Sequence, residues 1–207
     1  NILTESGQEL PIYTKIVLGT SNFFVNYWIL LVIGLIAGLV LFFRYVRTDE
    51  GGLAWDKFKL SIPYVGDLYQ KLYLSRFSDN MHTMIISGIP MVRALEITRD
   101  VVGSKVYEEM LTEVSEDVRG GAALSTAIGQ YEEMPGIIVQ MTRVGEETGE
   151  LGSMLETMAK FYRREVQNSV DTLIGLIEPA MIIILGGGVA VLLASVLMPI
   201  YNLAGGF

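Results

Sequence analysis

The stretch that decides the fold is residues 151–200, LGSMLETMAKFYRREVQNSVDTLIGLIEPAMIIILGGGVAVLLASVLMPI, which changes character half-way along. Its first part repeats apolar residues every three or four positions, the period of a helix with one buried face. This stripe consists of Leu151, Met154, Leu155, Met158, Tyr162, Val166, Val170, Leu173 and Ile177. Its second part, residues 179–200, carries no charge and is long enough to cross a bilayer as a helix. The stretch therefore predicts one continuous helix that leaves a bundle and enters a membrane, with a bend at Pro179.

A second uncharged stretch, FFVNYWILLVIGLIAGLVLFF at residues 23–43, predicts another spanning helix. Basic residues flank both spans on the side of the intervening segment: Arg44, Arg47, Lys57 and Lys59 after the first, and Lys160, Arg163 and Arg164 before the second. Loops rich in Lys and Arg face the cytoplasm. We therefore expect residues 44–178 to be a cytoplasmic domain of a multi-pass protein, and residues 1–22 and 201–207 to lie outside.

The composition suits a charged domain joined to a few spans. The 207 residues are 51% hydrophobic and 18% charged, with a net charge of −8 and no cysteine. The acidic balance argues against nucleic acid, since binding to phosphates needs a basic surface. No basic signal segment follows Asn1, and we expect the chain to be the later part of a longer protein.

The segment between the spans predicts helices and no convincing strand. Helical periods separated by glycine and proline indicate about six antiparallel helices in one bundle, so the fold class is an all-α membrane protein with two spanning helices. Pro90 is expected to open a helix, and Ser104 to cap the helix that follows it. Small residues at four-residue spacing, Gly34 and Gly38 in one span and Gly186, Ala190 and Ala194 in the other, predict close packing against a helix of this or another chain.

The acidic stretch RVGEETGELGSML, residues 143–155, has three readings. Its carboxylates do not alternate as a calcium loop requires, although Glu146 and Glu150 leave a weak divalent site open. No lysine is near to complete a phosphate cradle. The plainest interpretation is a turn between helices, with Gly149 in the left-handed region after the first helix. Acidic residues oppose the macrodipole at that helix end, so we also expect the turn to face a partner.

Other chemistry is sparse, and we expect neither an enzyme nor a cofactor or metal. His82 is the only histidine, which leaves no triad or zinc site, and no P-loop occurs. Glu178 could serve as a proton-relay or catalytic carboxylate, but its place at the edge of a span favours a structural or partner-binding role. A transporter or channel subunit is the alternative, although neither span has polar residues along a path at membrane depth.

Several segments together resemble one known family. The segments SGIPMVRALEI, MPGIIVQMTRVGEETGELGSMLETMAKFY, IEPAMIIILGG and LMPIYNL are similar to the C-terminal half of the type II secretion system F (GspF/PilC) family. The resemblance extends over nearly the whole chain, and its most specific pieces are the G-E-x-[ST]-G-x-L run and the E-P pair. The run falls on Gly145, Glu147, Thr148 and Gly149, with Glu146 as the alternative glutamate, and the pair falls on Glu178 and Pro179.

The resemblance implies an inner-membrane platform protein of a type IV pilus or a type II secretion machine, without enzymatic activity. It implies a hexameric assembly ATPase, alignment-complex proteins and pilin or pseudopilin as partners, beside membrane lipid and further copies of the chain. The candidate partner-binding residues are Arg143, Glu146, Glu147, Thr148, Gly149, Glu150, Glu178 and Pro179. It also implies a longer protein with two such helical domains and three spans, of which this chain resembles the second domain and the last two spans.

Overall fold

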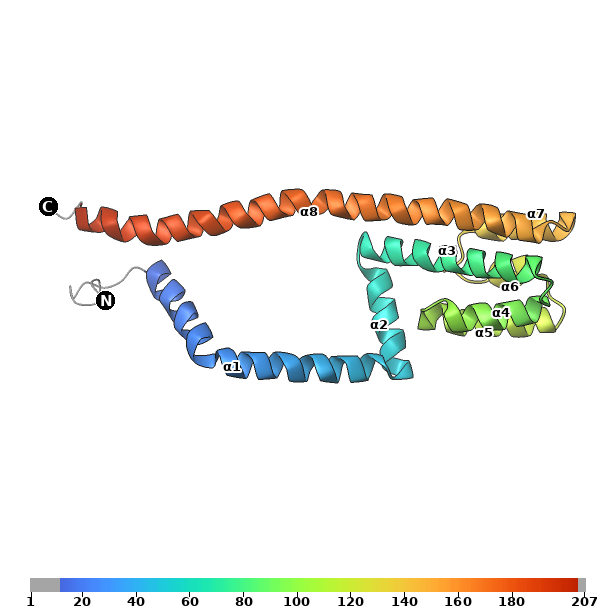
Figure 1. Ribbon diagram of the computed structural model, residues 1–207, viewed down its shortest axis with the longest axis horizontal. Coiled ribbons are helices and arrows are strands. Elements are labelled where there is room, and N and C mark those ends of the chain that lie inside the picture. Colours follow the sequence, from blue (N-terminus) through green and yellow to red (C-terminus); the bar gives the residue numbers. More distant parts are fainter. Residues whose placement is uncertain (1–11, 205–207) are drawn as a thin grey trace. The chain divides into compact units, whose positions relative to one another are not determined.

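The computed structural model describes the backbone of residues 12–204, and the side chains of most of residues 23–197. This part of the chain folds into helices without a strand (Figure 1), which confirms the all-α class. The helices are α1 (Ile12–Val46), α2 (Asp49–Ser61), α3 (Val65–Ile86), α4 (Met91–Val101), α5 (Lys105–Arg119), α6 (Leu124–Ile128), α7 (Gly136–Thr148) and α8 (Leu151–Ala204). Residues 1–11 of the expected outer segment and 205–207 of the expected tail lie outside the described residues.

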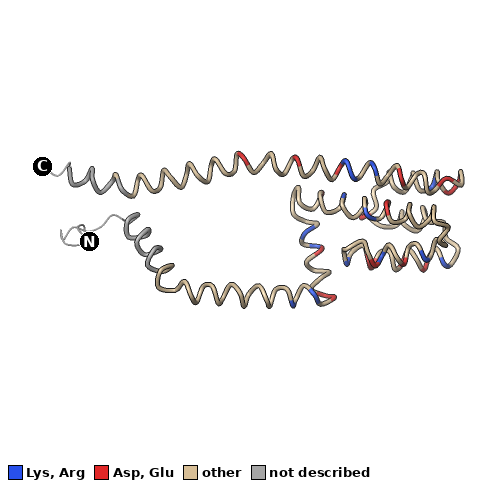
Figure 2. The backbone as a smooth tube through the Cα atoms, viewed as in Figure 1, with Lys and Arg blue, Asp and Glu red and all other residues tan. Residues whose placement is uncertain are grey.

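The chain divides into two compact units. One, here the apolar unit, takes in α1 as far as Phe43 and α8 from Gly175 onward, and the other, here the bundle unit, is Arg44–Ile174. Two helical segments, Phe23–Val46 and the apolar part of Leu151–Ser195, are long and apolar enough to cross a membrane. The side chains of both apolar segments are exposed rather than buried within the protein. Charged residues are concentrated in the bundle unit (Figure 2). Helix α8 runs unbroken from Leu151 to Ala204, which confirms the expected continuous helix.

The core of the bundle unit is formed by large side chains from α3, α4, α5, α6, α7 and the start of α8. Its largest fully buried members are Tyr107, Phe77, Leu74, Met81, Leu95, Leu111, Leu124, Ile128, Ile138 and Leu155. The stripe predicted on α8 is buried at Leu151, Leu155, Met158 and Tyr162, whereas Val166, Val170 and Leu173 are only half-buried. The apolar stripe of α8 is thus buried over its first part, where the other helices of the bundle unit cover it, and becomes more exposed beyond Tyr162.

Helix α2 is the element that the sequence pattern did not reveal. It lacks a long apolar stripe, and its consecutive glycines, Gly51 and Gly52, are poor helix formers. Its N-terminus is nevertheless capped by Thr48, whose Oγ1 accepts a hydrogen bond from the Gly51 amide at 3.1 Å. In Figure 1, α2 runs across the direction of α3 rather than along it.

The N-terminus of α5 is capped by another helix and not by its own first residue. Ser104 does occupy the expected N-cap position, but its side chain makes no capping hydrogen bond, and its Oγ is buried without a partner among the described residues. The Lys105 amide instead donates to the carboxylate of Asp56 in α2. Asp56 is almost fully buried and also pairs with Lys59. Ser104 is thus the N-cap residue, as predicted, but the Asp56 carboxylate and not the Ser104 hydroxyl accepts a hydrogen bond from the first turn of α5.

Candidate partner-binding site

The turn between α7 and α8 holds the acidic residues singled out from the sequence. Helix α7 ends at Thr148, and Gly149 follows it with a φ of 76°, which confirms the expected left-handed residue. Thr148 Oγ1 donates to the Val144 carbonyl at 2.8 Å and accepts from the Glu150 amide at 3.4 Å. Helix α8 then begins at Leu151, so only two residues separate the helices.

Gly145 allows α7 and α8 to meet closely beside this turn. A Cβ atom at position 145 would lie 2.7 Å from the Leu151 Cα and 3.2 Å from the Leu151 nitrogen. Both are backbone atoms, so they cannot move aside as the end of a flexible side chain could. The first glycine of the signature run is thus required by the packing of two backbones.

Glu146 is directed into the bundle unit. Its carboxylate accepts hydrogen bonds from the amides of Leu124, at 2.5 Å, and Ser125, at 3.2 Å, which are the first residues of α6. These amides have no partner within their own helix, so Glu146 caps α6 from α7. This gives Glu146 a structural role, and it competes with any part in the weak divalent site considered from the sequence. The described residues contain no group of three or more acidic, His or Cys side chains placed to hold a metal ion.

The neighbouring polar residues face outward. Arg143, Glu147, Thr148, Gly149 and Glu150 are all exposed. The carboxylates of Glu147 and Glu150 make no hydrogen bond or ion pair with the part of the chain that the structure describes. The signature run therefore combines two residues that build the turn, Gly145 and Glu146, with acidic residues that are available to a partner.

Helix α3 holds the start of α8 in place. His82 Nδ1 lies 2.7 Å from the Gly152 carbonyl, within hydrogen-bond distance. A Cβ at Gly152 would lie 2.9 Å from a methyl carbon of Ile86, so the end of α3 packs against the first turn of α8. The sequence placed His82 on the surface or in the core of an amphipathic helix, and the structure shows it half-buried at this junction.

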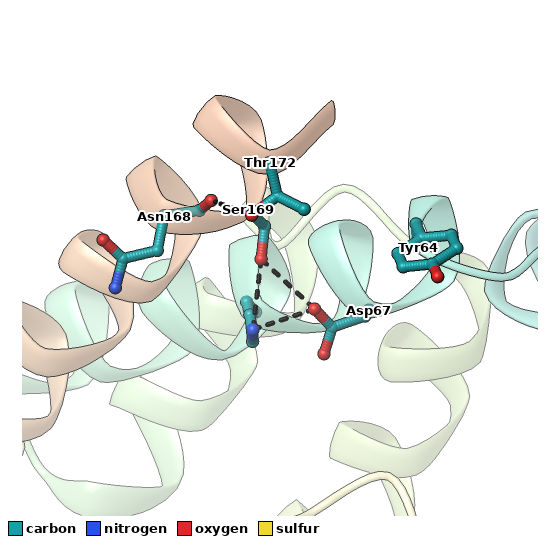
Figure 3. Close-up of a pocket in the computed structure, with 6 residues that line it drawn as sticks. Tyr64, Asp67, Asn168, Ser169 and Thr172 are labelled. Atoms are coloured by element: carbon teal, nitrogen blue, oxygen red, sulfur yellow. Dashed lines mark hydrogen bonds and ion pairs between the residues drawn. The ribbon is translucent and has the colours of Figure 1, made fainter. Parts of the chain in front are cut away.

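The same two helices are also joined by polar contacts near the start of α3. Lys71 of α3 pairs with Asp67 at 2.8 Å and with Glu165 of α8 at 3.2 Å, and it donates to Ser169 Oγ at 3.1 Å. Ser169 Oγ in turn donates to Asp67 at 3.2 Å (Figure 3). The hydrogen bond that Lys71 donates to Asp67 raises the pKa of Lys71 above its ordinary value, with partial burial acting against it and Glu165 acting in the same direction.

These contacts fix the register of α3 against α8, but they contribute little to the stability of the bundle unit. Further along, Arg163 pairs with Asp79 at 3.1 Å, and both side chains are more than half exposed. Exposed ion pairs contribute at most about 1 kcal/mol each, whereas the buried side chains of the core contribute several times more. Because α3 and α8 lie antiparallel with partners at both ends, α8 cannot slide against α3 without breaking both sets of contacts.

Glu178 and Pro179 lie in the apolar unit, away from the turn in the sequence. Both are exposed within α8, which continues through Pro179 without a break. The packing residues predicted in the spans have no close neighbour in the described structure. A Cβ added at Gly34, Gly38 or Gly186 would meet no other atom of the described chain within 4 Å. Ala190 and Ala194 are likewise exposed.

The carboxylates that cap other helices could not be identified from the sequence. Asp56 and Glu146 resemble any other surface acid there, because each is separated from its amide partner by more than twenty residues. The available signal was indirect. Acidic residues near the C-terminal end of α7 oppose the macrodipole, and for Glu146 that cost is offset by the amides of α6.

Taken together, these features define a helical membrane protein in which one helix extends from an acidic turn into an apolar segment. The family model described as type II secretion system (T2SS), protein F, matches residues 77–199. The chain belongs to this family.

Relatives in bacteria carry pilus and secretion names. The chain is 33% identical to a type IV pilus assembly protein PilC of Thermus thermophilus, over 99% of this chain and 50% of the relative. It is 30% identical to PilC of Pseudomonas aeruginosa, over 95% of this chain and 53% of the relative. It is 29% identical to the type II secretion system protein F of the same organism, over 98% of this chain and 50% of the relative. The chain spans about half the length of the curated relatives it matches.

Proposed function

We propose that this chain is part of an inner-membrane platform of a type IV pilus or type II secretion machine. Family membership and two apolar, exposed helices support a place in the inner membrane. In this proposal the bundle unit lies in the cytoplasm and both ends of the chain lie outside, as the basic residues Arg44 and Arg47 beside the first span favour. A reporter inserted at Arg119 should therefore be active only as a cytoplasmic reporter. Activity of a periplasmic reporter there would refute the topology.

The platform couples a hexameric assembly ATPase to the extraction and polymerisation of pilin or pseudopilin. The observation that carries this proposal is the unbroken course of α8 from the acidic turn to the apolar segment. The first turn of α8 is held by Gly145 and His82, so a force applied at the turn moves the helix and not only the loop. A packed helix transmits such a force as a shift or rotation and needs no chemical step. This agrees with a platform that is not an enzyme.

The acidic turn is the proposed docking site for the cytoplasmic partners. Its outward residues are Arg143, Glu147, Thr148, Gly149 and Glu150, and exposed acidic side chains complement a basic patch on a partner. The ATPase is the partner proposed for this site, and alignment-complex proteins are proposed for other faces of the bundle unit. Glu146 supports the site from within, by holding α7 to α6.

The spans are proposed to contact pilin or pseudopilin helices and further copies of the platform. Gly34, Gly38, Gly186, Ala190 and Ala194 leave shallow, exposed surfaces on which another helix could pack closely. Glu178 and Pro179 mark the proposed boundary between bundle and bilayer. Glu178→Gln should preserve packing while removing the charge. Reduced pilus or secretion output at normal protein level would support a partner-binding role, and unchanged output would exclude one.

The docking proposal is tested by removing two charges at the turn. The full-length protein carrying Glu147→Ala and Glu150→Ala should copurify about tenfold less with the assembly ATPase, equivalent to about 1.4 kcal/mol. The matched control is Glu116→Ala with Glu132→Ala, which removes the same charge from exposed positions elsewhere on the bundle unit. Equal retention of the ATPase by both double variants, at normal membrane levels, would refute docking at the turn.

A further inference from the structure

The corner between α2 and α3 contains a strained and exposed aromatic residue. Tyr64 has a φ of 64°. Among the residues that the structure describes, no other non-glycine residue has a positive φ. Its side chain is 63% exposed. A bulky residue in this region of φ is costly, and such strain tends to persist where the surroundings or a function require it. The core of the bundle unit does not use the Tyr64 ring, so the reason for its position lies outside that core.

Both ends of α2 lie close to the points at which the chain becomes apolar. Helix α2 begins at Asp49, shortly after Arg44, the first residue of the bundle unit. At its other end, Tyr64 lines a small pocket of about 150 Å³ together with Asn168 and Thr172 of α8 (Figure 3). Just beyond Thr172, Ile174 is 60% exposed and opens the apolar part of α8. Each end of α2 therefore lies near a residue that adjoins an apolar segment in the chain.

The orientation of α2 about its own axis is fixed by its buried side. Asp56 binds the Lys105 amide of α5 and pairs with Lys59, while Lys59 also donates to the Tyr73 hydroxyl at 3.3 Å. Burial lowers the pKa of Lys59, but the hydrogen bond and the charge of Asp56 outweigh it and raise that pKa overall. A rotation of α2 about its own axis would break these buried polar contacts. The opposite face of α2 therefore stays directed away from the core of the bundle unit.

That outward face carries aromatic and basic side chains. Ala54, Lys57, Phe58 and Ser61 are exposed and follow the i, i+3, i+4, i+7 spacing of one helix face. Phe58 is 53% exposed and stacks on the half-buried Trp55, with ring centroids 5.6 Å apart. Aromatic rings and lysine side chains are enriched where a protein meets the headgroup region of a bilayer.

We propose that α2 is an interfacial anchor, with Trp55, Phe58 and Tyr64 inserted at the boundary between lipid headgroups and acyl chains. Lipid is the occupant that fits, because these exposed aromatic side chains stand on a helix that follows the first apolar segment of the chain by only a few residues. Lys57, Arg44 and Arg47 are exposed nearby and suit phosphate groups. The anchor would hold the base of the bundle unit against the bilayer. It does not depend on which partner docks at the acidic turn.

Tryptophan fluorescence in a lipid bilayer tests this placement. The chain has two tryptophans, so Trp28→Phe and Trp55→Phe give a background into which Phe58→Trp is introduced. The whole chain is reconstituted in nanodiscs whose phosphatidylcholine is either plain or brominated on the upper part of its acyl chains. Because an interfacial helix buries its apolar face ~5–10 Å deep, the fluorescence of the Phe58→Trp protein should fall about twofold in the brominated discs.

Two further single-tryptophan proteins complete the test. Ile86→Trp, in the same background, is the matched control, since Ile86 is 63% exposed but lies at the opposite end of α3. Its fluorescence should be unchanged by brominated lipid. Tyr64→Trp provides a second reporter on the proposed face, in case the Phe58→Trp change disturbs the ring stack. Circular dichroism establishes that each variant keeps its helices.

The outcomes separate lipid from water and from protein. Quenching of the reporters at 58 and 64 by brominated lipid, with none at 86, supports the anchor. Quenching at 58 and 64 by aqueous acrylamide alone would place the face in solvent and overturn the proposal. Protection from both quenchers would mean that another protein surface covers the face, and this too would overturn it.

Discussion

The first half of α8, up to Ile174, and its second half, from Gly175, are both helical but differ in how deeply their side chains are buried. In the first half, Leu155, Met158 and Tyr162 are each at most 5% exposed, and they belong to the same buried cluster as side chains of α3, α5 and α7. In the second half, side chains such as Leu192 are 62% exposed, and the glycines have open space around them. The first half owes its place to packing in the bundle unit. The second half makes no comparable contacts within the described chain.

Truncation of a core leucine gives the largest expected difference between the halves. Leu155→Ala removes a side chain that is 1% exposed, and it should lower the free energy of unfolding of the bundle unit by about 2–5 kcal/mol. Leu192→Ala, in the apolar half, should change it by less than about 0.5 kcal/mol, since a lipid-exposed residue stays in lipid when the bundle unfolds. Urea unfolding of the detergent-solubilised chain, followed by circular dichroism, measures both. Similar losses for the two variants would show that the halves are not energetically distinct.

Glycine substitutions sharpen the same comparison. Gly145→Ala places a Cβ 2.7 Å from the Leu151 backbone, so it should destabilise the bundle unit by about 1–3 kcal/mol. Gly186→Ala has no such neighbour and should leave the stability unchanged, but it should reduce pilus or secretion output if another helix packs there. Unfolding measurements and an output assay on both variants separate the two effects. A stable Gly145→Ala protein would contradict the close packing of α7 and α8.

Adjacent glutamates should behave differently although both are acidic residues of one helix. Glu146→Ala leaves the first amides of α6 without their acceptor and should cost about 1–2 kcal/mol. Glu147→Ala removes an exposed side chain and should cost less than about 0.5 kcal/mol. Thermal unfolding of the two single variants decides this. If Glu147→Ala were the more destabilising, the assignment of structural and outward roles would be reversed.

The smallest expected effect is a pH dependence confined to the bundle unit. Burial and a hydrogen bond to Glu113 raise the pKa of Tyr131 to about 12, and burial raises that of Tyr162 to about 12. Because the pKa values are raised on folding, the protonated forms stabilise the fold fully below about pH 10, the ordinary tyrosine pKa. That stabilisation is lost as the pH rises from about 10 towards 12.

Tyr131→Phe should therefore flatten the loss of stability over this alkaline range. Denaturant midpoints measured at several alkaline pH values test the slope, with the parent chain as reference. An unchanged slope would mean that Tyr131 does not contribute. The lipid-facing half of α8 has no tyrosine between Gly175 and Ser195, so its helicity should not change over the same range.

Much of the architecture followed from local pattern. The uncharged stretches at 23–43 and 179–200 and the stripe from Leu151 to Ile177 depend on short-range periodicity and composition, and these predicted the helices and the continuous α8. Gly149 was also predictable, since a glycine after a helix has a local conformational reason. The resemblance carried by the G-E-x-[ST]-G-x-L run pointed to the family that the comparison then confirmed.

The tertiary structure decided what the polar residues do. Asp56 caps α5 across 49 residues of sequence and Glu146 caps α6 across 22, so neither role has a local signature. Ser104 occupies the N-cap position that the sequence predicted, but its hydroxyl makes no capping hydrogen bond. Periodicity reports which residues face a core, since each step along a helix turns the side chain by a constant angle. Which carboxylate meets which amide depends on how separate helices pack together, and no local pattern encodes that.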